Sequence, residues 1–150
     1  MKSLKQIIRE EYQKILQEQN QSGLIKTLKI RRVHGGVHCQ HSNITSLKGA
    51  PSSVDGNFYC YNNNLTSLEG APSSVGGHLD CSDNNLTSLE GAPSSVGGGF
   101  YCYNNNLTSL EGAPSSVGRN FSCKLQKSGV KFTEEDVRKV SDVEGSIITT

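Results

Sequence analysis

The sequence predicts a solenoid of stacked 21-residue coils, because three features recur with one period through most of its 150 residues. A cysteine returns every 21 residues, an apolar residue stands two positions before each cysteine, and leucine or isoleucine follows the first four cysteines by five and by eight positions. One 21-residue unit cannot bury its own apolar side, whereas stacked units cover one another. The cysteines are Cys39, Cys60, Cys81, Cys102 and Cys123.

The composition agrees with one domain and argues against several classes of partner. Hydrophobic residues make up 33% of the chain, a low value, but their strict period opposes disorder. The net charge of +1 gives no overall field that would attract nucleic acid or a membrane surface. No apolar run approaches the roughly 18 residues of a membrane span. We therefore expect no nucleic-acid partner and no membrane partner.

The first expected element is an N-terminal amphipathic helix over residues 1–18. Ser3 and Gln6 form an S-x-x-Q capping box at its start. Residues 19–23 are a polar linker that would allow the helix either to cap the first coil or to dock onto a partner. The helix is charged throughout, so it is unlike the apolar core of a signal peptide. Its apolar stripe comprises Leu4, Ile7, Ile8, Tyr12, Ile15 and Leu16.

The solenoid itself is expected over residues 24–129, with Leu24–Val33 as a strand that leads into the stack. In each coil one short strand, as in FYCY, alternates between two faces. Phe58 and Cys60 would point inward, while Tyr59 and Tyr61 would point outward. Successive coils should set these strands side by side in one parallel sheet, about 4.8 Å apart.

The rest of each coil, such as LTSLEGAPSSVGG, should return by turns with little helix. Its proline and glycines oppose a long helix or strand. The apolar residues of this return, represented by Leu65, Leu68, Ala71 and Val75, should point into the coil.

Residues 130–150 are expected to form a C-terminal cap. Thr133 can cap a short helix that runs to about Val140, with Val137 and Val140 turned inward. A terminal helix of this kind would seal the last coil.

The repeated motif F-x-C-x-x-N-N-x-L-x-x-L resembles the leucine-rich repeat core L-x-L-x-x-N-x-L over about residues 33–126. The following E-G-A-P resembles the short proline-containing return of the bacterial effector class of these repeats. One departure is the extra residue in the Gly76–His78 segment between Val75 and Leu79. In its GAPSSVGG coils, N-terminal helix and GVKFTEEDVRKV tail, the chain is also similar to small repeat proteins of tailed bacteriophages. That similarity implies a location in the cytoplasm of a bacterial host or in a phage particle, with virion proteins as possible partners.

The resemblance places an inward ladder of asparagines at Asn63, Asn84 and Asn105, with Ser42 and Gln126 at the corresponding outer positions. Where a strand bends, backbone N–H and C=O groups lose their partners. A buried amide can supply both a donor and an acceptor there. We expect a structural role for this ladder.

Neither the cysteines nor the histidines indicate a chemical centre. The cysteine spacing is unlike a metal-binding C-x-x-C motif, and a free cysteine packs well as a small buried hydrophobe. We therefore interpret the five cysteines as an inward core ladder. No catalytic carboxylate pair, nucleophile motif or phosphate-binding loop is evident. We expect no catalytic residues, no metal and no cofactor, and hence a protein that is not an enzyme.

The outward strand residues are the candidate partner-binding site, because the coils differ most there. Tyrosine offers a large contact area and is enriched at binding hot spots. The tyrosine pairs stand two coils apart, at about 9–10 Å, so they would not pack on each other. The sequence therefore favours a non-enzymatic protein-binding module. The proposed contacts are Tyr59, Tyr61, His78, Asp80, Ser82, Tyr101 and Tyr103.

Several alternatives remain open at this point. The tyrosines could simply stabilise the sheet by packing along their own row. The chain could be a structural or accessory component of a bacteriophage particle, anchored by its N-terminal helix. A sugar or ice surface could bind a threonine row, although a single row is narrow for that purpose. That row comprises Thr45, Thr66, Thr87 and Thr108.

Overall fold

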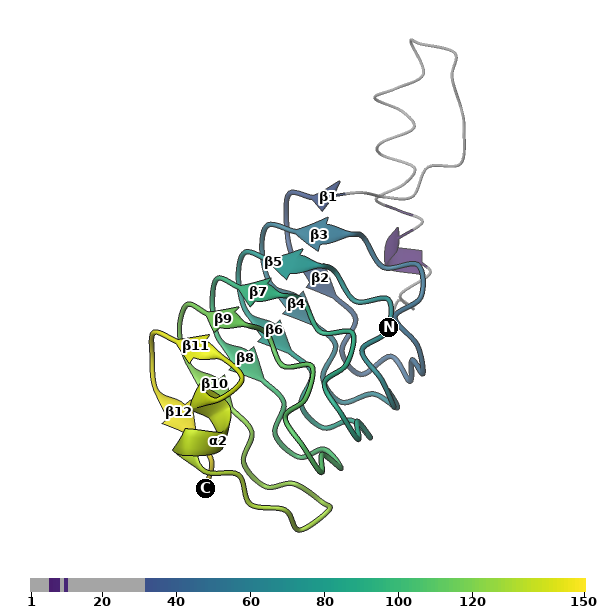
Figure 1. Ribbon diagram of the computed structural model, residues 1–150. Helices are drawn as coiled ribbons and strands as arrows, with labels where there is room; N and C mark the ends of the chain where they lie inside the picture. Colours follow the sequence, from purple (N-terminus) through teal and green to yellow (C-terminus); the bar gives the residue numbers. More distant parts are fainter. Residues whose placement is uncertain (1–5, 9, 11–31) are drawn as a thin grey trace.

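The chain folds as a β-solenoid of stacked coils of about 21 residues, as the computed structural model of residues 6–8, 10 and 32–150 shows (Figure 1). The coils follow one another along a single axis, from β1 at one end to β12 at the other. Among the described residues, no helix is long and apolar enough to cross a membrane. The stack of coils along one axis confirms the predicted solenoid.

Two parallel sheets of six strands each run the length of the stack, and each coil gives one two-residue strand to each sheet (Figure 1). We call the first the serine sheet, after the residue that begins four of its strands. The second is the tyrosine sheet. The serine sheet contains β1 (Arg32–Val33), β3 (Ser53–Val54), β5 (Ser74–Val75), β7 (Ser95–Val96), β9 (Ser116–Val117) and β11 (Asp142–Val143). The tyrosine sheet contains β2 (Val37–His38), β4 (Phe58–Tyr59), β6 (Leu79–Asp80), β8 (Phe100–Tyr101), β10 (Phe121–Ser122) and β12 (Ile147–Ile148).

The prediction of one sheet is wrong, because the Ser-Val pair of each return is extended and pairs with its neighbours. The N–H of Gly76 donates to the carbonyl of Val54 at 2.8 Å, and the N–H of Gly97 donates to the carbonyl of Val75 at 2.9 Å. The extra residue in Gly76–His78 lies at the corner where the chain passes from β5 to β6. A Cβ on Gly76 would lie 2.3 Å from the carbonyl oxygen of Asp55, so this position has no room for a side chain.

The core is a column of apolar side chains enclosed by the two sheets and the return segments. The strands are in register with a step of one repeat, so Phe58 pairs with Leu79. Phe58, Cys60, Leu65 and Leu68 are fully buried. Each coil thus covers the apolar side of the next, which confirms the inward assignments. The same assignment holds for Val75, which is buried, and for Ala71, which packs partly buried against the core.

Buried amide side chains tie each coil to the one before it, as the asparagine ladder predicted. Asn84 donates through Nδ2 to the carbonyls of Cys60 and Cys81, at 3.0 and 3.1 Å. Its Oδ1 accepts the N–H of Leu65 at 2.9 Å. Asn63 and Asn105 repeat the arrangement. Gln126 supplies the same donor and acceptor in the last coil.

A row of left-handed residues precedes this ladder, and the sequence analysis did not identify it. The φ angles lie between 52° and 54° at Asn62, Asp83 and Asn104, and at 53° in His41. Asparagine and aspartate adopt this conformation more readily than other residues with a Cβ. Leu125 occupies the same place in the last coil with φ of 54°, and its side chain is 69% exposed.

The N-terminal expectations fall mostly outside the described residues. Residues 6–8 and 10 are helical, and Ile7 and Ile8 pack against the core. The remainder of the predicted helix, the linker at 19–23 and most of the Leu24–Val33 strand are not described. Of that strand, the described Arg32–Val33 forms β1.

At the C-terminal end, α2 (Glu134–Arg138) lies in the return segment of the last coil. Thr133 caps it through a reciprocal capping box with Asp136, and Val137 is fully buried. The prediction that Val140 points inward is wrong, because the helix ends before this residue and leaves it 38% exposed. Within the range expected to be a cap, β11 and β12 continue both sheets.

The amide ladder predicts a large loss of stability on removal of one rung. Asn84→Ala should lower the free energy of unfolding by roughly 2–4 kcal/mol, because at least two buried backbone groups lose a partner at about 1–3 kcal/mol each. The measurement is urea unfolding followed by circular dichroism. Asn64→Ala, at an exposed asparagine, is the matched control and should change stability by less than about 0.5 kcal/mol. Equal losses in both variants would contradict the structural role of the ladder.

The left-handed row predicts a stabilising substitution. Leu125→Asn should raise the free energy of unfolding by about 0.5–1 kcal/mol, because asparagine relieves part of the roughly 1–2 kcal/mol cost of this conformation for other side chains. Leu125→Ala serves as the control, since it removes the exposed side chain but keeps the unfavourable backbone. A thermal melt that ranks alanine equal to asparagine would argue against backbone strain at this position.

Candidate functional site

The candidate site is the outward face of the tyrosine sheet, on which side chains form rows one coil apart. One row contains His38, Tyr59, Asp80, Tyr101 and Ser122, as the strand register fixes. Another lies two residues further along each coil and contains Gln40, Tyr61, Ser82, Tyr103 and Lys124. The four tyrosines are all half-buried, so each presents part of its ring to solvent.

Several rings on this face contact one another, including histidines that the sequence analysis did not connect with the tyrosines. Tyr59 meets His38 edge to face with ring centroids 5.1 Å apart, and it meets Tyr61 of its own coil at 6.2 Å. Tyr101 contacts His78 with centroids 5.9 Å apart. These contacts restrict the rings before any partner arrives, which lowers the entropy lost on binding. Ring contacts of this kind are also expected if the tyrosines only stabilise the sheet by packing along their own row.

Asp80 lies between the two tyrosine pairs and is half-buried. Its Oδ1 accepts the N–H of Ser82 at 3.0 Å and the hydroxyl of Ser82 at 2.5 Å. Burial raises the pKa of the Asp80 carboxyl above its ordinary value, although the hydrogen bonds from Ser82 oppose this rise. The structure thus holds a carboxylate in an environment that disfavours its charged form.

The expectation that Ser82 is exposed for a partner is wrong. Its side chain is fully buried, and it is the residue that orients Asp80. In its row Ser82 stands between Tyr61 and Tyr103, and these larger side chains cover the small serine from both sides. Strand alternation correctly gave the face of Ser82, but exposure depends on the neighbouring coils.

His78 has a backbone partner that the sequence did not reveal. Its Nδ1 accepts the N–H of Gly99 at 2.8 Å, while the N–H of His78 itself donates to Oδ1 of Asn57 at 2.8 Å. Asn120 accepts the N–H of Ser146 in the same way. These side chains satisfy backbone donors at the corner between the sheets. His78 is therefore half-buried and fixed, at the edge of the tyrosine face.

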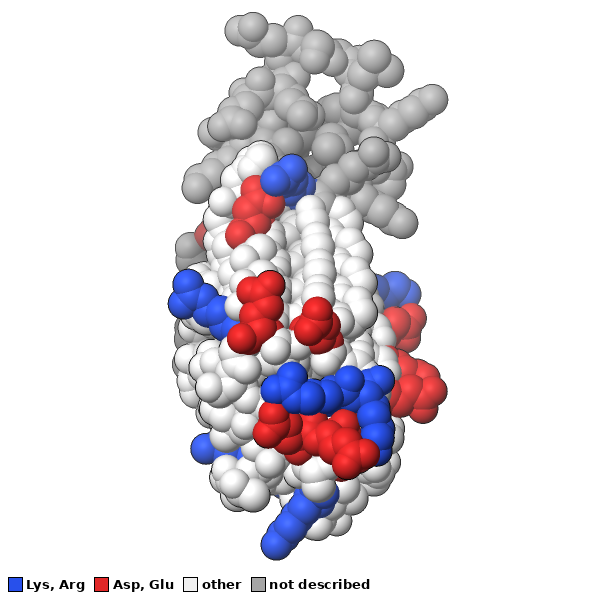
Figure 2. All heavy atoms as spheres, turned by 60° about the vertical axis from the view of Figure 1, so that its left-hand side comes forward, with Lys and Arg blue, Asp and Glu red and all other residues white. Residues whose placement is uncertain are grey.

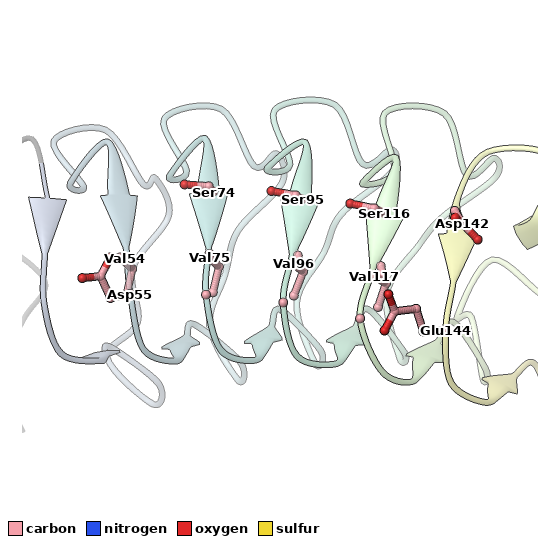
Figure 3. Close-up of a pocket in the computed structure, with 13 residues that line it drawn as sticks. Val54, Asp55, Ser74, Val75, Ser95, Val96, Ser116, Val117, Asp142 and Glu144 are labelled. Carbon is pink, nitrogen blue, oxygen red and sulfur yellow. The ribbon is translucent and has the colours of Figure 1, made fainter.

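The outward face of the serine sheet is a shallow groove that the sequence analysis missed. Serines, valines and glycines line it, and carboxylates stand at its ends (Figures 2 and 3). At one end Asp55 is engaged by Arg32 at 2.8 Å and by His34 at 2.9 Å. The hydrogen bond from Arg32, together with that from His34, lowers the pKa of Asp55. Asp142 and Glu144 stand at the other end (Figure 3).

The cysteine row is buried along the core as predicted. All five thiols are free and buried, and Sγ of Cys81 donates to the carbonyl of Tyr101 at 3.3 Å. Burial raises the pKa of the Cys39 thiol to about 12 and, less strongly, that of Cys123 to about 11. A thiol with such a pKa is a poor nucleophile at neutral pH. Among the described residues, no group of three or more histidine, cysteine or acidic side chains could hold a metal ion.

The chain matches no protein-family model, no curated protein and no solved structure.

The buried thiols predict both chemical inertness and loss of stability in alkali. At pH 8 the native protein should react with iodoacetamide far more slowly than the urea-unfolded protein, because the thiols are protonated and enclosed. The thiol pKa is 9.0 before burial and about 12 for Cys39 in the fold. Since the folded pKa is raised, the associated stability is fully present below about pH 9 and is lost as the pH rises towards 12.

The measurement for stability is urea unfolding at pH 7 and at pH 10.5, with the lower value expected at pH 10.5. Cys39→Ala should reduce the difference between the two pH values, because one buried thiol no longer titrates. Rapid alkylation of Cys60, Cys81 and Cys102 in the native state would contradict the inward orientation of the row.

Proposed function

We propose that this protein is a non-enzymatic protein-binding module that uses the outward face of the tyrosine sheet. The observation that supports the proposal is the presence of four half-exposed tyrosines on one face, together with a half-buried carboxylate that forms no ion pair with another described residue. The binding residues on this face would be Tyr59, Tyr61, Asp80, Tyr101 and Tyr103. His78 would support the edge of the face, and Ser82 would act only by orienting Asp80.

The architecture supports binding because the residues that stabilise the fold point inward, while other residues form the outer surface. Every coil uses its inward side chains and its amide rung for stability, so the outward positions can change from coil to coil without loss of the fold. Tyrosines with restricted rings lose little entropy on contact with a partner. Such a face is suited to recognition of another protein.

The sequence resemblances remain proposals about origin and setting. The amide ladder supports a relationship to leucine-rich repeats, while the second paired sheet is a difference from the single sheet expected for them. A phage origin, and a location in a bacterial cytoplasm or a phage particle, rest on the sequence alone. For the N-terminal helix, the packing of Ile7 and Ile8 on the core favours the role of a cap over that of an anchor.

The proposed function predicts that a partner depends on the tyrosines. A variant with Tyr59, Tyr61, Tyr101 and Tyr103 all changed to serine should lose a protein that the tagged wild type captures from cells of the source organism. The reason is that these rings supply most of the apolar contact area of the face. The measurement is quantitative mass spectrometry of the captured proteins.

The matched control changes Ser74, Ser95 and Ser116 to alanine on the serine sheet and should retain the partner. Circular dichroism must show that both variants keep the fold. If the folded tyrosine variant captures the same proteins in the same amounts as the wild type, the tyrosine face is not the binding surface.

A further inference from the structure

Asp80 is a half-buried carboxylate that forms no ion pair with another described residue, and the nearby His78 lowers its pKa less than the hydrogen bonds from Ser82 do. Its Oδ1 is used by Ser82, but Oδ2 has no hydrogen-bond partner in the described part of the chain. None of the ion pairs among the described residues involves Asp80, in contrast to Asp55, which binds both Arg32 and His34. A partly desolvated charge without a partner is unfavourable in the isolated protein.

The fold itself does not require a carboxylate at this position. The equivalent positions in the other coils carry histidine, tyrosine and serine, at His38, Tyr59, Tyr101 and Ser122. The other coils therefore form without a carboxylate here. In its own coil Asp80 accepts two hydrogen bonds from Ser82, but the partial burial of its charge opposes stability. Residues that oppose stability in this way are characteristic of binding sites.

The two neighbours of Asp80 in its row are both aromatic. Tyr59 and Tyr101 belong to the adjacent strands and pair with Asp80 in register. Strands in a sheet are about 4.8 Å apart, so the backbones that carry these tyrosines stand about 9–10 Å apart with Asp80 midway. A cation bound at Asp80 would thus stand between two strands that carry aromatic side chains, and a cation within about 6 Å of a ring centroid makes a cation–π contact.

We propose that the tyrosine face recognises an arginine side chain of its protein partner, bound between Tyr59 and Tyr101 and paired with Oδ2 of Asp80. This inference rests on the proposed function of the same face. The guanidinium group is planar and weakly hydrated, so it can stack on tyrosine while it donates hydrogen bonds to the carboxylate. The positive charge would compensate Asp80 and supply specificity for arginine over a neutral isostere, while the stacking would add contact area.

The experiment is an NMR titration of the full-length, isotope-labelled protein with three capped pentapeptides. Each has two glycines on either side of a central residue, which is arginine, citrulline or glutamine. Citrulline keeps the size and planarity of arginine but is uncharged. The arginine peptide should cause saturable shifts at Tyr59, Asp80 and Tyr101, with an affinity at least about tenfold above that of the citrulline peptide.

Asp80→Asn is the decisive variant, because asparagine keeps an oxygen that Ser82 can donate to and removes only the charge. It should weaken binding of the arginine peptide by at least about tenfold, the effect of losing a hydrogen bond between charged groups. Its melting temperature should be equal to or above that of the wild type, because the partly buried charge is gone. Asp142→Asn is the matched control on the serine sheet and should leave the affinity unchanged.

Three results would overturn the inference: no shifts with the arginine peptide, equal affinity for arginine and citrulline, or equal weakening by Asp80→Asn and Asp142→Asn. The capture experiment separates this failure from failure of the proposed function. If a cellular partner depends on the four tyrosines but is retained by Asp80→Asn, the face binds a protein without an arginine at this position. If no partner depends on the tyrosines, the proposed function itself fails.

Discussion

The hydrogen bonds from one buried amide per coil are the interaction on which the rest of this structure depends. At the end of each tyrosine-sheet strand the backbone bends, and its carbonyls would lie unpaired in an apolar core. Asn84 and its equivalents bond to carbonyls of two successive coils and accept an N–H from the coil before. The same rung therefore satisfies the bend within its own coil and ties that coil to the one before.

The left-handed row and the corner between the sheets follow from this constraint. The residue before each rung must turn the chain sharply, which explains the positive φ at Asn62, Asp83 and Asn104. At the other end of the strand, Asn57 and His78 accept backbone N–H groups from the coil that follows. The strands β4, β6 and β10 are thus fixed at both ends by side chains that reach across coils. Strands of two residues can form an ordered sheet because these contacts repeat along the stack.

A rigid stack leaves the outward positions free to carry function. On the serine sheet the outward face is a groove of small residues with charges at its ends, and the pairing of Asp55 with Arg32 and His34 satisfies one of these charges internally. On the tyrosine sheet the central carboxylate lacks such a partner and lies among aromatic rings. This difference between two faces of one solenoid is the reason that we place recognition on the tyrosine sheet.

The sequence by itself determined the solenoid, the inward column of Phe58, Cys60 and Leu65 equivalents, and the amide ladder. The solenoid and the inward column follow from a period of 21 residues together with the need to bury apolar groups, whereas the resemblance of the motif to the leucine-rich repeat core placed the amide ladder. The sequence also determined the face on which the tyrosines and Asp80 lie, because alternation along a strand is local. The tertiary structure alone decided the second sheet, the burial of Ser82, the exposure of Val140 and the contact of His78 with Gly99. These depend on what the neighbouring coil presents, since a Ser-Val pair becomes a strand only when another lies beside it. A small side chain likewise becomes buried only when larger ones flank it, and neither condition can be read within one repeat.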